Sequence, residues 1–186
     1  NGMLAMYTSM LYLPWVIKPL WSPFVDIIRT KRWWIMAMQI IMSAAFALLA
    51  LTLPHPSSEV IASGGTQVSL FAVTLIIFWI TAFASATHDI AADGYYMLAL
   101  KTDEQSLFVG IRSTFYRLSS IFGQGVLVVI AGVLERKSGD IPHAWSMTLL
   151  ISAVIFAAIT FLHIFRLPKA AADDPRRNTP GADIFR

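Results

Sequence analysis

Residues 69–86 read SLFAVTLIIFWITAFASA, a stretch with no charged side chain on any face. An amphipathic helix on the surface of a soluble protein would place polar residues along one side. A strand of a membrane barrel would alternate apolar and polar residues. About 20 apolar residues are enough for a helix to cross the roughly 30 Å hydrocarbon core of a bilayer, so this stretch predicts a transmembrane helix.

Similar apolar blocks recur along the 186 residues, of which 56% are apolar and 13% charged. The mean hydropathy of +0.64 fits a chain that lies mostly in lipid, where only helices and closed barrels satisfy the backbone. The sequence therefore predicts an all-α polytopic membrane protein. We expect one helix bundle over residues 1–169 and then a charged, proline-containing cytoplasmic linker, interpreted as disordered, over 170–186. The five expected spans are 3–25, 33–53, 68–100, 107–134 and 146–165.

The basic residues predict the orientation of these spans. The loop over 26–32 carries Arg29, Lys31 and Arg32, whereas the loop over 54–67 carries neither lysine nor arginine. By the positive-inside rule, the first loop and the linker lie on the cytoplasmic side. Because the basic residues lie beside membrane segments, the net charge of +3 indicates the lipid bilayer as partner and not a nucleic acid.

Several chemistries are excluded or unsupported by the sequence. The chain has no cysteine, which excludes disulfides and thiolate metal sites. No zinc-ligand spacing, phosphate-binding glycine loop or nucleophile elbow is present. We therefore expect neither a metal nor a cofactor.

The number of spans suggests a piece of a larger assembly. Many transporters consist of two six-helix halves joined by a long cytoplasmic linker after the sixth helix. The linker expected here follows the fifth span. The spans are therefore interpreted as helices two to six, with the first helix and the C-terminal half of the same protein as missing partners.

Ionisable residues are concentrated in residues 87–117, THDIAADGYYMLALKTDEQSLFVGIRSTFYR. Asp89 and Asp93 are spaced i, i+4 and therefore share one helical face. If the expected spans 68–100 and 107–134 form an antiparallel pair that turns near residue 103, Asp89 lies level with Arg117, and Asp93 with Ser113 or Arg112. Tyr96 extends the first polar stripe and Gln124 the second.

Two interpretations of this cluster stay open. The carboxylates of Asp89 and Asp93 form either a structural ion-pair latch or a gate or proton site in a transport cycle, because charges inside a bilayer are rare and often functional. His88 lies beside Asp89 and is a candidate proton relay near neutral pH, or a hydrogen-bonded structural residue.

Basic residues within the spans are candidate ligands for an anionic solute. Arg117 and Lys18 either face an aqueous cavity and attract a carboxylate, or extend toward the headgroups. The predicted substrate-binding set is Arg117, Lys18, Arg112, Tyr96 and Gln124.

Three motifs carry a resemblance to known transporters. YLPWVIKPLWSPFVDIIRTKRWW (12–34) is similar to the end of helix two and the following loop of the major facilitator superfamily. ATHDIAADGYY (86–96) and GIRSTFYRLSSIFGQG (110–125) resemble helices four and five of AmpG-type muropeptide permeases. Gly94, Tyr95 and Tyr96 stand where those permeases more often have alanine, an aromatic and a basic residue.

The resemblance implies a fold, an activity and a location. The chain would form most of the N-terminal half of a major facilitator transporter in a bacterial-type inner membrane. It would take up a small solute, muropeptide-like, amino-sugar or peptide, driven by a proton gradient. The corresponding facilitator loop implies a cytoplasmic latch formed by Asp26, Arg29, Lys31 and Arg32.

Two other functions stay open. An exporter of drugs or metabolites can use the same fold, because coupling sets the direction of transport. An intramembrane acyltransferase, with His88 and a neighbouring carboxylate as its base, is a remote alternative.

Overall fold

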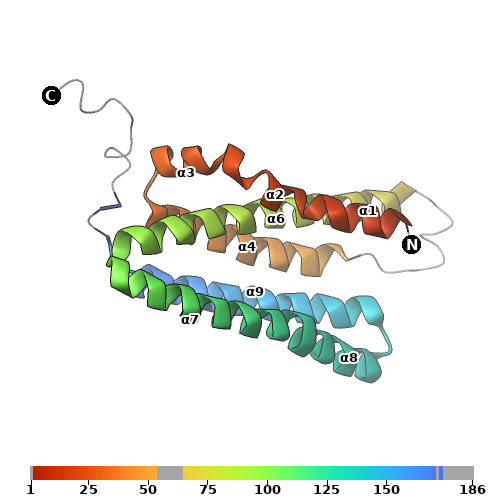
Figure 1. Cartoon of the computed structure of the whole chain (residues 1–186). Coiled ribbons are helices and arrows are strands. Elements are labelled where there is room, and N and C mark those ends of the chain that lie inside the picture. The colour runs from red at the N-terminus through yellow and green to blue at the C-terminus, as the bar shows by residue number, and fades with distance from the viewer. Residues whose placement is uncertain (1, 54–64, 171, 174–186) are drawn as a thin grey trace. The chain divides into compact units, whose positions relative to one another are not determined.

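The computed structural model describes residues 2–53, 65–170 and 172–173, and this part of the chain is helical apart from turns and short connections (Figure 1). Short helices come first, and long helices follow. Their bounds are α1 Gly2–Leu11, α2 Leu13–Val16, η1 Lys18–Leu20, α3 Ser22–Ile28, α4 Lys31–Thr52, α6 Gly65–Ala99, α7 Thr102–Ile121, η2 Phe122–Val126, α8 Leu127–Ser138 and α9 Ile141–Arg166.

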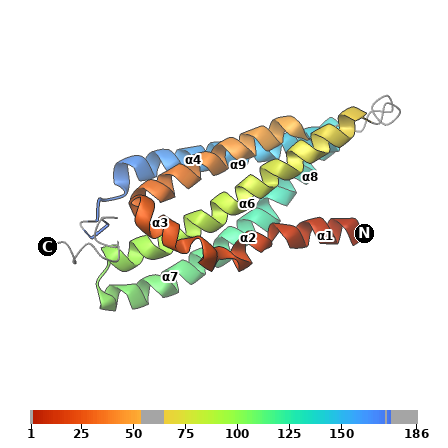
Figure 2. The ribbon, with the colours of Figure 1, turned by 90° about the horizontal axis from the view of Figure 1, so that it is seen from above.

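The first expected span, 3–25, is not a continuous helix. Pro14, Pro19 and Pro23 each occupy one of the first two positions of α2, η1 and α3. Proline lacks an N–H and clashes with the preceding turn, so it is tolerated at a helix start and not in its interior. Three prolines at close spacing therefore divide this span into short pieces, and the ribbon changes direction before α3 (Figure 2).

Within the described residues, four helical segments are long and apolar enough to cross a membrane: Lys31–Thr52, Leu70–Ala99, Thr102–Ser138 and Ile141–Arg166. They match the expected spans from the second onward, with starts and ends shifted by several residues. Large apolar side chains on them are exposed, as is usual for helices that face lipid, among them Leu51, Ile76 and Phe115. These helices indicate a multi-pass membrane protein, and a fifth crossing stays a prediction.

Glycines mark two features of the third of these segments, Thr102–Ser138. The sequence FGQGV forms η2, a π-helical turn between α7 and α8, where wider turns of this kind are frequent near functional sites. Gly139 ends α8 with φ 69°, a left-handed conformation that glycine adopts without strain. Its N–H donates to the Glu135 carbonyl at 2.8 Å.

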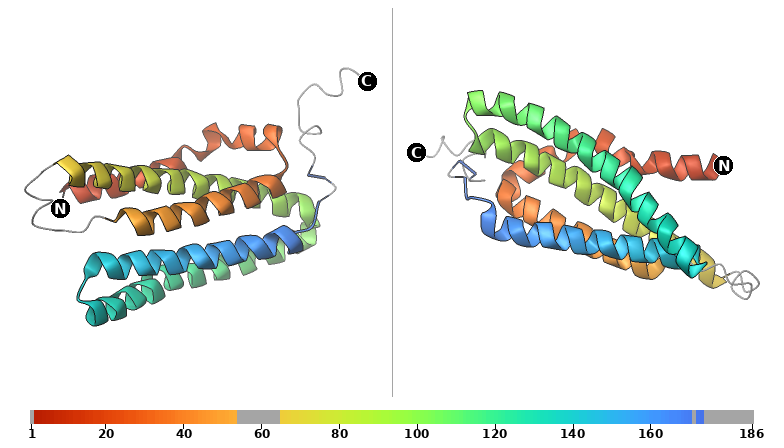
Figure 3. Two further views of the ribbon diagram at one scale, coloured as in Figure 1. Left: turned by 180° about the vertical axis from the view of Figure 1, so that it is seen from behind. Right: turned by 90° about the horizontal axis from the view of Figure 1, so that it is seen from below.

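The chain divides into two compact units, to both of which α4, α6 and α9 contribute residues. The first unit contains the described residues of 2–42, 79–101 and 156–173. Val25, Ile90 and Tyr95 belong to its main buried cluster. Figure 3 shows that the ribbon of α1 to α3 is broken into short coils, whereas that of α4 is uninterrupted.

The second unit contains the described residues of 43–78 and 102–155. Ala45, Leu49 and Ile77 form its buried cluster. The Ser43 hydroxyl donates to the Ala153 carbonyl at 3.0 Å, which joins α4 to α9 within this unit. Residues 54–64 of the expected loop over 54–67 lie outside the described residues.

Candidate functional site

An ion pair joins the interrupted N-terminal helices to α6. The Lys18 ammonium group donates to the Asp89 carboxylate. The two side chains are only 22% and 24% exposed. Lys18 begins η1 immediately after the break that follows α2, and its Nζ lies 5.2 Å from the ring centroid of Trp15. The proline-rich segment thus presents a cation to the carboxylate of α6.

A cavity of about 720 Å³ lies beside this pair, within the first unit. Lys18, Asp26 and Asp93 supply charged groups to its wall, while Trp15 and Met97 are among its apolar lining residues. Small-molecule sites typically measure about 300–1,000 Å³ and combine apolar walls with a few polar groups. The cavity can therefore hold a small solute that carries charge.

Three polar side chains from three different helices meet close to the ion pair. The Gln39 amide of α4 lies between the imidazoles of His88 on α6 and His163 on α9. Gln39 Nε2 is 3.1 Å from His88 Nε2 and 2.8 Å from His163 Nδ1. Gln39 is only 4% exposed, so its amide is committed to these imidazoles.

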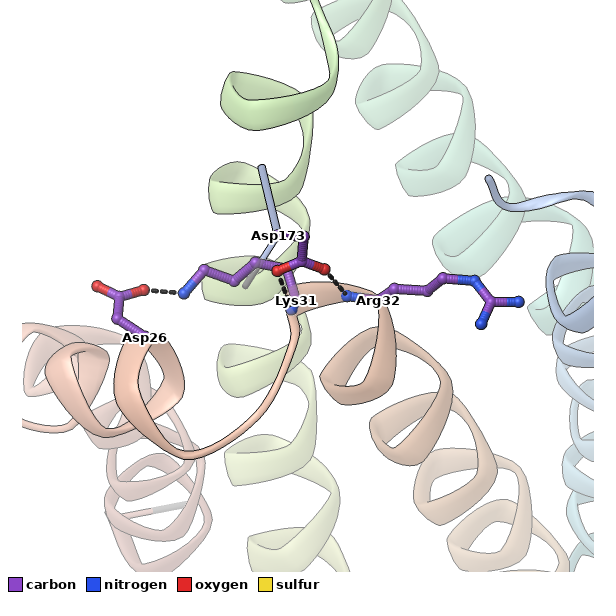
Figure 4. A network of polar contacts seen from close by, with 4 residues as sticks. All are labelled: Asp26, Lys31, Arg32 and Asp173. Carbon is purple, nitrogen blue, oxygen red and sulfur yellow. Dashed lines mark hydrogen bonds and ion pairs between the residues drawn. The ribbon is translucent and has the colours of Figure 1, made fainter. Parts of the chain in front are cut away.

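The loop between α3 and α4 is held by the segment that follows α9 (Figure 4). The backbone N–H groups of Lys31 and Arg32 donate to the two Asp173 carboxylate oxygens at 2.7 and 3.0 Å. Thr30 Oγ1 accepts from the Trp33 N–H at 3.2 Å. Because the first N–H groups of a helix lack intrahelical partners, these bonds form a cap for α4.

The end of α9 is held by α4 in return. Arg32 Nε and Nη2 donate to the carbonyls of Leu167 and Ile164, each at 2.9 Å. A cation at a helix C-terminus is favourable because the last carbonyls carry a partial negative charge. The Tyr95 hydroxyl also donates to the Pro168 carbonyl at 2.7 Å. Residues 167–170 and 172–173, here named the linker strap, therefore lie over the ends of α4 and α6.

The side chain of Lys31 crosses α6 and pairs with Asp26 at the end of α3 (Figure 4). Lys31 is 4% exposed. It passes directly over Gly94, where a β-carbon would lie 2.7 Å from Lys31 Cε. Arg29 instead lies over the Trp33 ring, with Cζ 5.8 Å from the ring centroid.

The expected site residues divide between the two units. Lys18, His88, Asp89, Asp93, Tyr96 and the latch residues Asp26, Arg29, Lys31 and Arg32 all belong to the first unit. Arg112, Arg117 and Gln124 belong to the second, where Arg117 and Gln124 are exposed and Arg112 is half-buried. The structure pairs Asp89 with Lys18, and the pairing of Asp89 with Arg117 stays a prediction.

The sequence interpretation missed three residues of this region. Gln39 and His163 are polar residues inside apolar spans, a signal that deserves a functional hypothesis by default. Asp173 was placed in a linker expected to be disordered. In the described part of the linker, Ala170 packs against the core cluster and Asp173 caps α4.

The fold and this region define a multi-pass membrane protein with buried polar contacts beside a cavity. Comparison with known proteins finds the anhydromuropeptide permeases of Escherichia coli strains K12 and O157:H7, each 26% identical over 158 residues, or 82% of this chain. The match spans 29% of the length of each permease. This distant similarity confirms the predicted resemblance to AmpG-type permeases. No protein-family profile and no solved structure matches the chain.

Proposed function

We propose that this chain is part of a proton-coupled secondary transporter of the major facilitator superfamily that takes up muropeptide-like, amino-sugar or peptide solutes. The observation that carries the proposal is its similarity to the anhydromuropeptide permeases over 82% of its length. The proposal places the protein in a bacterial inner membrane, with the linker strap on the cytoplasmic side. It also makes the N-terminal segment 3–25 a fifth, proline-broken crossing.

The charges at the cavity support a solute with charged groups. An ammonium group at Lys18 attracts a carboxylate of a peptide stem, and the carboxylates of Asp26 and Asp93 attract an amine. Apolar walls that include Trp15 and Met97 suit the carbon skeleton of such a solute. We propose that Tyr96, Arg112, Arg117 and Gln124 are further ligands of the solute during its transport.

The ion pair supports a gate. Lys18 either stays paired with Asp89 or leaves Asp89 and binds a carboxylate of the solute. If the solute and a proton compete for these two groups, binding and protonation bias the same conformational equilibrium. We propose that Asp89 and Asp93, with His88, couple this exchange to the proton gradient.

The test is uptake of labelled anhydromuropeptide by liposomes that contain the intact transporter, with an acidic exterior imposed. We expect accumulation that a protonophore abolishes and that is lost in Asp89→Asn. Solute extrusion under the same gradient would assign the exporter function instead. Acylated product formed without any gradient would assign the acyltransferase, and absence of all three would contradict the proposal.

A double-mutant cycle on thermal unfolding identifies the partner of Asp89. Removing one member of a partly buried pair leaves a charge without its counter-charge in a low dielectric. We therefore expect Lys18→Met and Asp89→Asn each to destabilise the transporter, and the double variant to recover part of the loss, with a coupling of about 0.5–3 kcal/mol. The matched cycle of Asp89→Asn with Arg117→Gln tests the sequence-predicted pair in the same way.

A further inference from the structure

The contact among Gln39, His88 and His163 has a geometry that a packing role does not require. His163 Nδ1 lies within hydrogen-bond distance of both ends of the amide, 2.8 Å from Nε2 and 3.0 Å from Oε1. His88 Nε2 lies 3.1 Å from the Nε2 end. The amide therefore touches one nitrogen of each imidazole.

An amide has one donating end and one accepting end, and a neutral imidazole has one N–H and one bare nitrogen. With the NH₂ group toward His88, the Nε2 of His88 must be bare, while Oε1 accepts from the Nδ1–H of His163. Turning the amide over reverses both roles, so that Oε1 accepts from the Nε2–H of His88 and the NH₂ group donates to a bare Nδ1 of His163. The orientation of Gln39 therefore links the tautomers of the two imidazoles, one on α6 and one on α9.

We infer that His88, Gln39 and His163 form a proton-binding site in which the two imidazoles share one added proton and Gln39 positions it on α6 or on α9. The inference rests on the proposed function and names the groups that hold its coupling proton. A second added proton is disfavoured, because two imidazolium ions would then lie against one buried amide.

The surrounding charges connect this site to the cavity. Asp89 is the neighbour of His88 on the same helix, and His163 on α9 shares the Gln39 amide with it. From α4 comes the uncharged Gln39, and from η1 comes Lys18, which is paired with Asp89. A proton on His88 supplies a second positive charge close to Asp89, so the carboxylate depends less on Lys18. Lys18, which also lines the cavity, then becomes available to an anionic solute.

Titration of the intact transporter, labelled with ¹⁵N-histidine and held in lipid nanodiscs, tests the site directly. Imidazole nitrogen shifts report which nitrogen carries the proton and at which pH the second proton binds. We expect the two imidazoles to take up protons in two linked steps, as interacting sites do. Two independent titrations in the unaltered protein would overturn the inference, so the test does not depend on a variant that folds.

Variants then assign the roles. In His163→Gln, and in the reciprocal His88→Gln, the two-step behaviour should collapse to a single step for the remaining imidazole. Gln39→Leu should make the two midpoints approach each other, because the amide no longer forces opposite protonation. His143→Gln is the matched control, since His143 is exposed and lies in the second unit. Unchanged midpoints in Gln39→Leu would reduce the glutamine to a packing residue and refute its positioning role.

Uptake measured on the same samples separates this inference from the proposed function. Gradient-driven uptake together with independently titrating imidazoles would leave the transporter intact as a proposal and reject the shared proton. Coupled titration without any gradient-driven uptake would reject proton-coupled transport. We expect both to be present, and the pH profile of uptake to shift in Gln39→Leu but not in His143→Gln.

Discussion

Gly94 shows how the absence of a side chain decides a local arrangement. A glycine at this position leaves room for Lys31 to cross α6 and reach Asp26. In sequence, Gly94 stands where AmpG-type permeases more often have alanine. The structure supplies the reason, because the space above the α6 backbone is filled by the methylene groups of Lys31.

Gly94→Ala should therefore displace Lys31 and destabilise the protein. The contact at 2.7 Å involves Cε, the far end of a flexible side chain, so Lys31 can move aside, but moving breaks its pairing with Asp26. Leaving the ammonium group without its counter-charge should cost more than the gain of about 0.5–1 kcal/mol from alanine in a helix. Thermal unfolding of the intact transporter measures the difference. Gly110→Ala on α7, where a β-carbon meets nothing within 4 Å, is the control and should be neutral or stabilising. Equal effects of both substitutions would contradict the crossing.

Residues far apart in sequence explain why part of the site escaped prediction. The i, i+4 spacing of Asp89 and Asp93 is visible without a structure, because both lie on one helix. The partners Lys18, Gln39 and His163 come from other helices. Their choice depends on how those helices pack, which no spacing rule contains.

At the scale of elements, the long helices could be predicted and the first span only in part. Apolar blocks predict helices well because a bilayer leaves the backbone no other hydrogen-bond partners. Apolarity does not report continuity, so the block over 3–25 predicted one span, in which the three prolines were expected to cause a bend. Its prolines stand at the starts of α2, η1 and α3, and that positional preference was the available signal for the breaks.

The reciprocal cap between α4 and α9 leads to a prediction for the linker strap. Asp173→Ala removes both acceptors from the first N–H groups of α4 and should destabilise the intact transporter by about 0.5–2 kcal/mol, as loss of a helix cap does. Asp173→Asn, which keeps one acceptor oxygen, should lose less. The measurement is the unfolding midpoint in denaturant or heat.

Asp174→Ala serves as the control for this cap, because it removes the same charge from the neighbouring position. If Asp174→Ala destabilises the protein as much as Asp173→Ala, the effect reflects net charge and the cap has no special role. A normal unfolding midpoint in Asp173→Ala would also contradict the cap.

At the scale of the whole molecule, the basic residues predict the side of the membrane on which each connection lies. Residues 26–32 and 101–106 should face the cytoplasm, together with the linker strap. In intact cells an impermeant thiol reagent should therefore label Lys137→Cys and leave Thr102→Cys unlabelled, in a background without other cysteines. Labelling of Thr102→Cys from outside would reverse the topology and remove the cytoplasmic placement of the linker strap.

The cap on α4 also has a consequence in time. Lys31 and Asp173 are 142 residues apart, and ribosomes add about 5–20 residues per second. For roughly 7–28 seconds after Lys31 is made, the start of α4 therefore exists without the carboxylate that caps it. During that interval its N–H groups must bond to water or lipid headgroups. The first turn of α4 is thus capped only after synthesis has passed the end of α9. Docking of the linker strap is therefore a late step in the folding of the protein.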